Sequence, residues 1–444
     1  MPNIRKIVKK IIPTELFKSV EPYGHLAEAM AANVRYGFPS RDMHIIGVTG
    51  TNGKTTSSFM IHRMLVEAGI DTGLMTTVAY GVNNDIKPQI AHMTTASAPL
   101  LQKRLREFKD QGVKWVVLET TSHALAQHRV WGIPYEIAVM TNITHEHLDY
   151  HGSFENYVAA KLELFKITNK NGRKFGIVNA EDPSADKFMS TTKRGVSYGV
   201  KKGDLRATDV KLEADGCRYV AKIDKDSYDI HCNIPGEFNV FNSLAAVAVG
   251  RELGLDKEQI EHGINALDGV EGRMSVVNEG QKFKVIIDFA HTPDSFEKLL
   301  SDLRESTKGK LITVFGSAGR RDESKRAIQG KIAGRYSDEV ILTEEDDRDV
   351  DGLEILEQIA SGAKKSGKVK DKDMFLILDR EEAIGFAMTR ASSEHDTVIL
   401  LGKGHEKTIE RADGTYPWNE MAAAQVALQT KLKITSKKPK TKSK

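Results

Sequence analysis

Short apolar runs alternate with amphipathic stretches through most of the chain, beginning near His44. Compact apolar runs are typical of strands buried on both faces, and the longer stretches between them are typical of helices that cover a parallel sheet. In the first part of the chain, the predicted strands are His44–Val48, Thr72–Tyr80, Lys114–Glu119, Ala138–Asn142 and Phe175–Asn179. The predicted helices are Thr56–Leu65, Leu100–Gln111 and Phe154–Lys166. This alternation predicts a P-loop-type α/β domain with a mostly parallel sheet.

The pattern changes between Asp204 and Pro235, where short segments of alternating polarity predict antiparallel strands at Arg218–Ile223 and Tyr228–Ile234. Two helices are predicted next, at Glu237–Leu253 and Lys257–Ala266. Glycines at Gly269 and Gly272 then indicate a domain boundary.

Beyond this boundary, strands and helices alternate again, which predicts a second, Rossmann-like α/β domain. The predicted strands are Phe283–Phe289, Lys310–Phe315, Glu339–Thr343, Met374–Leu378 and Thr397–Leu401. The predicted helices are Ser295–Leu303, Ser324–Arg335, Leu353–Ala360, Glu381–Thr389 and Glu420–Lys431. The predicted domains are therefore a short N-terminal segment (1–42), a central domain (43–269), a C-terminal domain (270–432) and a basic, disordered tail (433–444).

The N-terminal segment is expected to form two helices that end at Phe38-Pro39-Ser40. Its first residues are basic and partly amphipathic, and a helix packed on the domain is favoured over one that contacts a membrane surface. No apolar run has the length needed to cross a bilayer, and no signal-peptide pattern is present.

Composition adds little to this outline. A chain of 444 residues is long enough for two or three domains. A net charge of +3, to which seven lysines in the stretch 431–444 contribute, does not indicate a nucleic-acid-binding surface. The two cysteines, Cys217 and Cys232, are expected to be neighbours on one sheet without a required disulfide, which favours the cytoplasm. We expect a monomer that acts on small molecules.

A glycine-rich turn between the first predicted strand and helix is the strongest chemical signal. The sequence GVTGTNGKTT contains Gly50, Thr51, Asn52, Gly53, Lys54, Thr55 and Thr56. In such a strand–loop–helix unit, backbone N–H groups and the helix N-terminus hold phosphates, the lysine reaches the outer phosphates, and a threonine hydroxyl binds Mg²⁺. The spacing from Gly47 to Gly53 is one residue longer than in the common P-loop, so the loop is a variant of it. These residues predict an ATP-type nucleotide site.

Two further polar segments follow predicted strands. Glu119 ends one strand, where it is expected either to bind Mg²⁺, directly or through water, or to cap the next helix. The segment THEHLDYHG, with His145, His147 and His151, follows another strand. Zinc is one metal that these side chains could bind. A mixed carboxylate and imidazole site for Mg²⁺ or Mn²⁺ fits better, because no thiolate lies near.

Several motifs occur together in a fixed order: GVTGTNGKTT, LETTSHAL, TNITHEHLDYHG, YVAAKLELF, GEFNVFNSLAA, VEGRM, IDFAHTPDSF, VFGSAGRRDESKR and LLGKGHE. This set, from about Arg41 to Leu432, resembles the Mur ligase family, and within it the members that add the third amino acid to UDP-N-acetylmuramoyl-dipeptide in peptidoglycan synthesis. The resemblance implies an ATP-dependent amide ligation. A substrate carboxylate takes the γ-phosphoryl group to give an acyl phosphate, which the incoming amine then displaces.

The resemblance also implies roles for individual residues. Lys54 and Thr55 would hold phosphates and a first Mg²⁺, and Glu119 and His147 would hold a second Mg²⁺. Lys161, in YVAAKLELF, matches the lysine that the family carbamylates, and the carbamate would supply an oxygen ligand to the metal. Residues expected to contact the nucleotide from both domains, with closure on binding, are Asn239, Asn242, Arg273, Asp288 and His291.

Substrate contacts follow from the same resemblance. Residues that match the muropeptide site are Thr94, Thr95, Ser122, His123 and Arg129. Residues that match the site of the incoming amino acid are Arg321 in GRRDESKR, Asp346 and Arg348 in the stretch Glu345–Arg348, and Gly402 and Glu406 in GKGHE. An arginine there would hold a carboxylate and a glutamate would hold an amine.

The chain departs from the family pattern in three places. The segment before the glycine-rich loop is about half of what a complete uridine-binding domain would need. Glu146 stands where aspartate is usual, and the stretch Glu345–Asp349 reads EDDRD rather than the Asn-Pro-Arg form that is linked to diaminopimelate. The two extra acids would favour a lysine- or ornithine-like side chain, so the added amino acid stays open. The alternatives are a folylpolyglutamate-synthetase-like or other Mur-type amide ligase on a substrate without UDP, and a non-catalytic nucleotide-binding scaffold.

Overall fold

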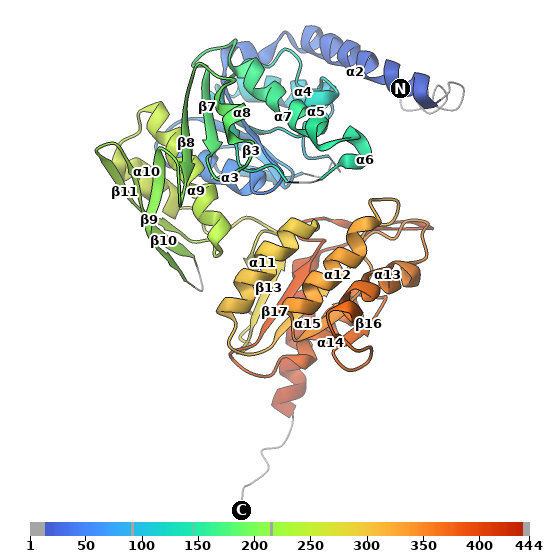
Figure 1. Ribbon diagram of the computed structural model, residues 1–444. Coiled ribbons are helices and arrows are strands. Elements are labelled where there is room, and N and C mark those ends of the chain that lie inside the picture. Colours follow the sequence, from blue (N-terminus) through green and yellow to red (C-terminus); the bar gives the residue numbers. More distant parts are fainter. Residues whose placement is uncertain (1–13, 90–92, 145, 214–215, 438–444) are drawn as a thin grey trace, which may run out of the picture. The chain divides into compact units, whose positions relative to one another are not determined.

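The computed structural model describes residues 14–89, 93–144, 146–213 and 216–437 (Figure 1). The chain divides into two compact units: unit 1 comprises Met1–Asn233 and Glu237–Asp268, and unit 2 comprises Ile234–Gly236 and Gly269–Lys444. Among the described residues, none of the helices combines the length and the apolar character needed to cross a membrane.

Unit 1 is built on one large sheet that, in the described residues, has 11 strands in the order β11-β10-β9-β8-β7-β6-β1-β5-β2-β3-β4. The strands are β1 (His44–Thr49), β2 (Thr72–Met75), β3 (Ala79–Val82), β4 (Asp85–Pro88), β5 (Trp115–Glu119), β6 (Tyr135–Met140), β7 (Phe175–Asn179), β8 (Arg194–Gly199), β9 (Leu205–Leu212), β10 (Cys217–Ile223) and β11 (Asp226–Cys232). From β9 to β2 the neighbouring strands pair in parallel, and the outer hairpins are antiparallel. The mostly parallel α/β fold predicted from the alternating pattern is confirmed.

Two groups of helices pack on this sheet. The helices of unit 1 are α2 (Thr14–Tyr36), η1 (Pro39–Asp42), α3 (Lys54–Glu67), α4 (Ala98–Asp110), α5 (Ser122–Ala126), α6 (Leu148–His151), α7 (Phe154–Thr168), α8 (Ala185–Met189), α9 (Glu237–Leu253) and α10 (Lys257–Asn265). Helices α3, α9 and α10 contact one another. The buried side chain of Ile45 on β1 belongs to the core formed with Leu101 of α4 and Leu164 of α7. Because side chains alternate along a strand, Ile46 and Val48 face the opposite side of the sheet.

The predicted single strand Thr72–Tyr80 is wrong. The chain turns at Thr76, whose hydroxyl accepts hydrogen bonds from the N–H groups of Val78 (3.3 Å) and Ala79 (3.1 Å) and donates to the carbonyl of Ala79 (3.0 Å). Strands β2 and β3 therefore form an antiparallel hairpin. A threonine hydroxyl that forms hydrogen bonds with nearby backbone groups stabilises a turn instead of continued strand pairing.

The two cysteines are neighbours, as predicted. Cys217 on β10 lies directly opposite Cys232 on β11, both are buried, and they form no disulfide. Of the N-terminal segment, for which two helices were predicted, the described part contains one continuous helix, Thr14–Tyr36, and a short 3₁₀ helix at Pro39–Asp42. The predictions for residues 1–13, including membrane contact, lie outside the described residues.

Unit 2 has, in the described residues, a six-stranded sheet in the order β12-β13-β17-β14-β15-β16 and a separate hairpin β18-β19. The strands are β12 (Ser275–Val276), β13 (Lys284–Asp288), β14 (Leu311–Phe315), β15 (Glu339–Leu342), β16 (Met374–Leu376), β17 (Thr397–Leu401), β18 (Thr408–Arg411) and β19 (Gly414–Pro417). The helices are α11 (Pro293–Ser306), α12 (Ser324–Tyr336), α13 (Gly352–Lys365), α14 (Arg380–Arg390) and α15 (Glu420–Lys437). The five strands from β13 to β16 pair in parallel, so their loops meet at one edge.

Helix α15 continues beyond its predicted end at Lys431 as far as Lys437, so residues 433–437 are helical where a disordered tail was predicted. Leu428 of this helix is fully buried in the core of unit 2, and the ammonium of Lys431 donates to the carbonyls of Met388 and Ala391. These contacts hold the end of the helix on the domain, and residues 438–444 lie outside the described residues.

Candidate active site

The glycine-rich loop lies between β1 and α3, and its two glycines have no room for a side chain. Gly53 has φ of 80° and Gly50 has φ of 150°, backbone conformations that favour glycine. A Cβ atom on Gly50 would lie 1.9 Å from Oγ1 of Thr141, and one on Gly53 would lie 2.3 Å from Oδ1 of Asn242. The glycines therefore allow the loop to pass close to two other segments of unit 1.

Residues after β6 fix the shape of this loop. The N–H of Thr51 donates to the carbonyl of Asn142 (2.7 Å), and the N–H of Asn52 donates to the side-chain oxygen of Asn142 (2.9 Å). Thr141 donates from its hydroxyl to the carbonyl of Asn52 (2.6 Å). Thr141 and Asn142 were not among the predicted site residues, although they follow β6, the strand that pairs with β1.

The start of α3 carries the predicted phosphate ligands. Lys54 donates from its ammonium to the carbonyl of Thr51 (2.7 Å), which folds the side chain back over the loop. Thr55 and Thr56 are buried, and the hydroxyl of Thr55 donates to Oε2 of Glu119 (3.0 Å). The structure thus brings Lys54, Thr55 and Glu119 together at the N-terminus of one helix, where the backbone dipole favours an anion.

Glu119 ends β5 and is only 1% exposed. Besides Thr55, its carboxylate accepts from the N–H of Thr77 (2.9 Å) and from the hydroxyl of Thr77 (3.1 Å). The alternative that Glu119 caps the next helix is wrong, because the N-cap of α5 is Thr121, whose side chain accepts from the N–H of Ala124. Glu119 and Thr55 offer the hard oxygen donors that suit Mg²⁺.

Lys161 on α7 points to the same loop. Its side chain is 2% exposed, and its nitrogen donates to the carbonyl of Gly50 (2.6 Å) and lies 4.6 Å from the ring centre of Tyr157. Burial lowers the pKa of Lys161 well below its ordinary value, and the charge of Lys54 lowers it further. A lowered pKa favours the uncharged amine, which is the form that reacts with carbon dioxide.

A cluster of aromatic and imidazole rings lies beside α5 to α7. The ring of His123 is 4.6 Å from that of His147 and 5.4 Å from that of His151. Burial lowers the pKa of His123 to about 3, with the neighbouring His147 and His151 as further causes, so His123 is neutral. His147 has φ of 56°, and its ring nitrogen lies 3.7 Å from the carboxylate of Glu146.

His145 lies outside the described residues. Among those that the structure describes, no group of three or more His, Cys, Asp and Glu side chains is arranged to hold a metal. The oxygen donors of Thr55 and Glu119 are thus the part of the predicted metal set that the structure places together.

Two of the residues predicted for the muropeptide, Thr95 and Arg129, are joined by a hydrogen bond. The hydroxyl of Thr95 donates to the carbonyl of Glu119 (2.9 Å), and Arg129 donates to the carbonyl of Thr95 (3.0 Å). Ser122 is buried and lies 3.0 Å from a ring nitrogen of His151. Thr94 is half-buried, next to Thr95. Through Thr95, this pair adjoins the carboxyl end of β5, the strand next to β1.

The predicted adenine-side residues of unit 1 lie on α9. Asn239 and Asn242 are buried, and the amide of Asn242 donates to Oδ1 of Asn239 (2.8 Å). Oδ1 of Asn242 accepts from the hydroxyl of Ser57 on α3 (3.2 Å). Asn242 is thereby fixed against the glycine-rich loop.

In unit 2, the three predicted nucleotide residues are neighbours. Asp288 accepts from the N–H groups of Met274 (2.8 Å) and Ala290 (2.8 Å), and burial raises its pKa although the charge of Arg273 opposes this. Arg273 lies over the ring of Phe289 at 4.7 Å, and His291 bonds to the carbonyl of Phe289 (2.9 Å). That these residues contact the nucleotide stays a prediction.

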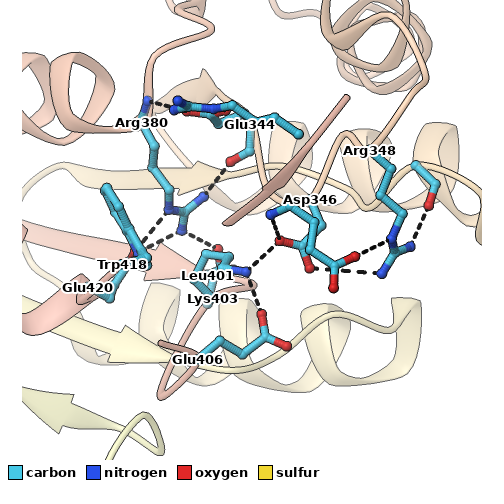
Figure 2. Close-up of polar contacts among 12 residues, drawn as sticks. Glu344, Asp346, Arg348, Arg380, Leu401, Lys403, Glu406, Trp418 and Glu420 are labelled. Atoms are coloured by element: carbon cyan, nitrogen blue, oxygen red, sulfur yellow. Dashed lines mark hydrogen bonds and ion pairs between the residues drawn. The ribbon is translucent and has the colours of Figure 1, made fainter. Parts of the chain in front are cut away.

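Four of the five residues predicted to bind the incoming amino acid lie on the loops after β15 and β17 (Figure 2). Asp346 and Glu406 are joined by the buried Lys403, whose ammonium lies 2.8 Å and 2.6 Å from their carboxylates. Arg348 donates to the carboxylate of Glu410 (2.7 Å) and to a backbone carbonyl, that of Gly319 (2.6 Å).

The other two residues predicted for the amino-acid site are Gly402, which is closely packed, and Arg321, which is exposed. Gly402 has φ of 99°, and a Cβ there would lie 2.7 Å from the carboxylate of Glu345. Arg321 is exposed on the loop after β14. Lys403 and Glu410 were not predicted as site residues, although Lys403 lies in the motif LLGKGHE and a buried lysine needs an acidic partner.

Asp347, between Asp346 and Arg348, gives a prediction for stability. Burial, with the nearby charges of Glu344 and Glu345, raises its pKa to about 6, and its Oδ1 has no hydrogen-bond partner. A raised carboxyl pKa favours folding below the ordinary pKa, and this contribution is lost as the pH rises through 6. Asp347→Asn should therefore raise Tm at pH 8 and have little effect near pH 3, as thermal unfolding at both pH values would measure.

Asp349 provides the matched control. It is exposed and paired with Arg320, which lowers its pKa, so its charge favours folding above its ordinary pKa. Asp349→Asn is expected to leave Tm unchanged or slightly lower at pH 8. A Tm at pH 8 that falls in Asp347→Asn as well would contradict the assignment.

Both units match known families. Residues 48–250 match the Mur ligase middle domain, and residues 272–404 match the Mur ligase glutamate ligase domain. UDP-N-acetylmuramyl-tripeptide synthetase of Roseiflexus sp. is 40% identical over 421 residues, which cover 92% of this chain and 82% of that protein. UDP-N-acetylmuramoyl-L-alanyl-D-glutamate–2,6-diaminopimelate ligase of Syntrophomonas wolfei is 37% identical over 406 residues, which cover 91% and 82%.

Solved structures agree. A structure of a UDP-N-acetylmuramoyl-L-alanyl-D-glutamate–2,6-diaminopimelate ligase has a TM-score of 0.62 and 29% identity, and the match covers 93% of this chain and 83% of that one. Folylpolyglutamate synthase of Mycobacterium tuberculosis has a TM-score of 0.69 at 17% identity over 85% of this chain and 92% of that one, which shows a shared fold alone. The chain belongs to the Mur ligase family of ATP-dependent, Mg²⁺-using amide ligases, as its motifs indicated.

Proposed function

We propose that this ligase adds the third amino acid to UDP-N-acetylmuramoyl-dipeptide. The observation that carries the proposal is the convergence of Lys161 and Glu119 on the glycine-rich loop, through Gly50 and Thr55. Relatives at 40% and 37% identity are named for addition of the third residue, which supports the same substrate. The relatives differ in the amino acid that their names give, so that choice needs a separate argument.

The proposed reaction has two steps. The substrate carboxylate attacks the γ-phosphorus of ATP, and ADP leaves to give an acyl phosphate. The amine of the incoming amino acid then attacks the acyl carbon, phosphate leaves, and the amine loses its proton. Such phosphoryl transfer depends on positioning and on charge stabilisation more than on covalent help from the protein.

In this reaction, Lys54 supplies positive charge at the phosphates and Thr55 with Glu119 would hold Mg²⁺, which neutralises charge on the transferred group when bound. The amine form of Lys161, which its lowered pKa favours, reacts with carbon dioxide to form a carbamate and release one proton. This step replaces an amine by a carboxylate-like group, and a second Mg²⁺ would be held by this carbamate with Glu119 and His147. The pKa of Lys161, lowered by burial, supports this role.

The charges in unit 2 favour an amino acid with a cationic side chain and one carboxylate. Arg348, which would otherwise receive a second carboxylate, is already paired with Glu410, and Lys403 is paired with Asp346 and Glu406. The buried acids Glu345 and Asp347 add negative charge on the same loop. We therefore propose lysine or ornithine in preference to diaminopimelate.

Phosphate release by the purified protein tests the proposal. The protein would be incubated with ATP, Mg²⁺ and UDP-N-acetylmuramoyl-dipeptide, and lysine, ornithine and meso-diaminopimelate would be compared, with omission of the muropeptide as the control. Release that requires the muropeptide and lysine or ornithine is expected. Release with diaminopimelate alone would contradict the amino-acid assignment, and no release with any amine, despite measurable ATP binding, would contradict the acceptor.

A further inference from the structure

A buried arginine at the carboxyl edge of the unit 2 sheet has no role in the proposed reaction. Arg380 is the first residue of α14 and is 0% exposed. Its guanidinium lies 2.6 Å from the carboxylate of Glu420, which is also buried and accepts from the indole N–H of Trp418 (2.7 Å). Figure 2 shows this group beside the loops that carry Asp346 and Lys403.

The remaining donors of Arg380 reach two different loops. One guanidinium nitrogen donates to the carbonyl of Glu344 (2.9 Å), just after β15, and another donates to the carbonyl of Leu401 (2.8 Å), the last residue of β17. These strands are not neighbours, because β14 lies between them in the sheet. Arg380 therefore joins the starts of two loops that no direct strand pairing holds together.

The same two loops are joined a second time, farther from the sheet. Lys403, in the loop after β17, lies 2.8 Å from the carboxylate of Asp346, in the loop after β15. Two buried cations thus fix one loop against the other. A buried ion pair adds little net stability over apolar side chains, but its directed hydrogen bonds specify one arrangement.

We infer that Arg380 is a positioning residue for the amino-acid site, through the loops 344–348 and 401–406. The inference rests on the proposed function of these loops. The hydrogen bonds of Arg380 go to Glu344, Leu401 and Glu420, and it acts on the spacing of the predicted substrate residues through the carbonyls of Glu344 and Leu401. A lysine in its place keeps the charge but lacks the planar fork that serves Glu420 and both carbonyls at once.

Arg390, the last residue of α14, offers a matched control. It makes a bidentate ion pair with Glu339 (2.6 and 3.0 Å), at the amino end of β15, far along the strand from the two loops. Arg380→Lys and Arg390→Lys therefore weaken bidentate arginine–glutamate pairs at opposite ends of the same helix, of which the first is fully buried and the second partly exposed. A third protein, Arg380→Met with Glu420→Met, removes both charges and leaves no buried acid unpaired.

Steady-state kinetics with the amino acid as the varied substrate form the first test. Arg380→Lys and the double variant are expected to raise KM for the amino acid about tenfold, the effect of one lost hydrogen bond to a charged group. The kcat and the KM for ATP should stay within about twofold, and Arg390→Lys should match the unmodified protein throughout. An unchanged KM for the amino acid in folded Arg380 variants, or an equal rise in Arg390→Lys, would overturn the inference.

Amide hydrogen exchange on the unliganded proteins tests the same inference without turnover. Arg380→Lys should exchange faster than the unmodified protein within 344–348 and 401–406, and Arg390→Lys should not. Unchanged exchange in both loops would overturn the positioning role. Absence of amino-acid-dependent turnover in the unmodified protein would instead contradict the proposed function, while the exchange result would still decide the role of Arg380.

Discussion

Lys161→Ala should abolish ligation and leave ATP binding largely intact. The lysine nitrogen donates to the carbonyl of Gly50 and burial lowers its pKa, so its removal takes away the group that would become the carbamate. We expect the rate of phosphate release to fall to about one thousandth or less, as for loss of a preorganised charge-stabilising group. Calorimetric titration with ATP and Mg²⁺ would measure binding separately.

Lys166, one helical turn farther along α7, is the control for this substitution. It is exposed and pairs with Glu163 on the surface. Lys166→Ala should release phosphate at the rate of the unmodified protein. Normal turnover in Lys161→Ala would exclude the carbamate assignment.

Lys54→Met should impair both nucleotide binding and turnover. Lys54 is the cation at the start of α3, beside Thr55 and above the backbone of Thr51. Methionine keeps most of the length and removes the charge, so we expect kcat/KM for ATP to fall by about two to three orders of magnitude. The loss of ATP affinity would distinguish this variant from Lys161→Ala.

Arg63→Met tests whether any lost cation on α3 has this effect. Arg63 lies in the same helix and pairs with Glu67 on its outer side. Its replacement should leave ATP affinity unchanged. A Lys54→Met protein that binds ATP as tightly as Arg63→Met would show that the loop holds phosphate without the lysine.

Regular periodicity made most of the fold predictable. The strand at His44–Val48, the glycine turn and the following helix are all present, because a buried strand and an amphipathic helix leave patterns that depend on neighbouring residues only. The hairpin β2–β3 was missed because Thr76 bonds its own backbone, which hydropathy does not record. Helix α15 is longer than predicted. Lys431, at its predicted end, donates to the carbonyls of Met388 and Ala391, and this contact with a distant segment leaves no local sequence pattern.

Site residues that belong to a sequence motif could be predicted. Residues that only hold a motif residue in place could not. Glu119 and Lys161 stand in recognisable motifs, and the structure places both at the glycine-rich loop. Thr77, which donates twice to Glu119, and Arg380, which joins two loops, have no local signature. Their partners lie 42 and 36 residues away, so only the folded chain reveals them. The roles assigned to the site residues stay predictions until they are measured.

The residues around the glycine-rich loop are far apart in the sequence, and this separation has a consequence for how the protein folds during synthesis. The loop after β1 is completed by Lys161, 111 residues after Gly50, and by Asn242, 185 residues after Ser57. Contacts between such distant segments form late, because the intervening chain must first be closed into a loop. A chain emerging from the ribosome therefore cannot form all of these contacts until α9 has been synthesised. A ligand that binds only the folded state stabilises that state by mass action. ATP bound at this loop would therefore stabilise the completed unit 1 and not a partly synthesised chain.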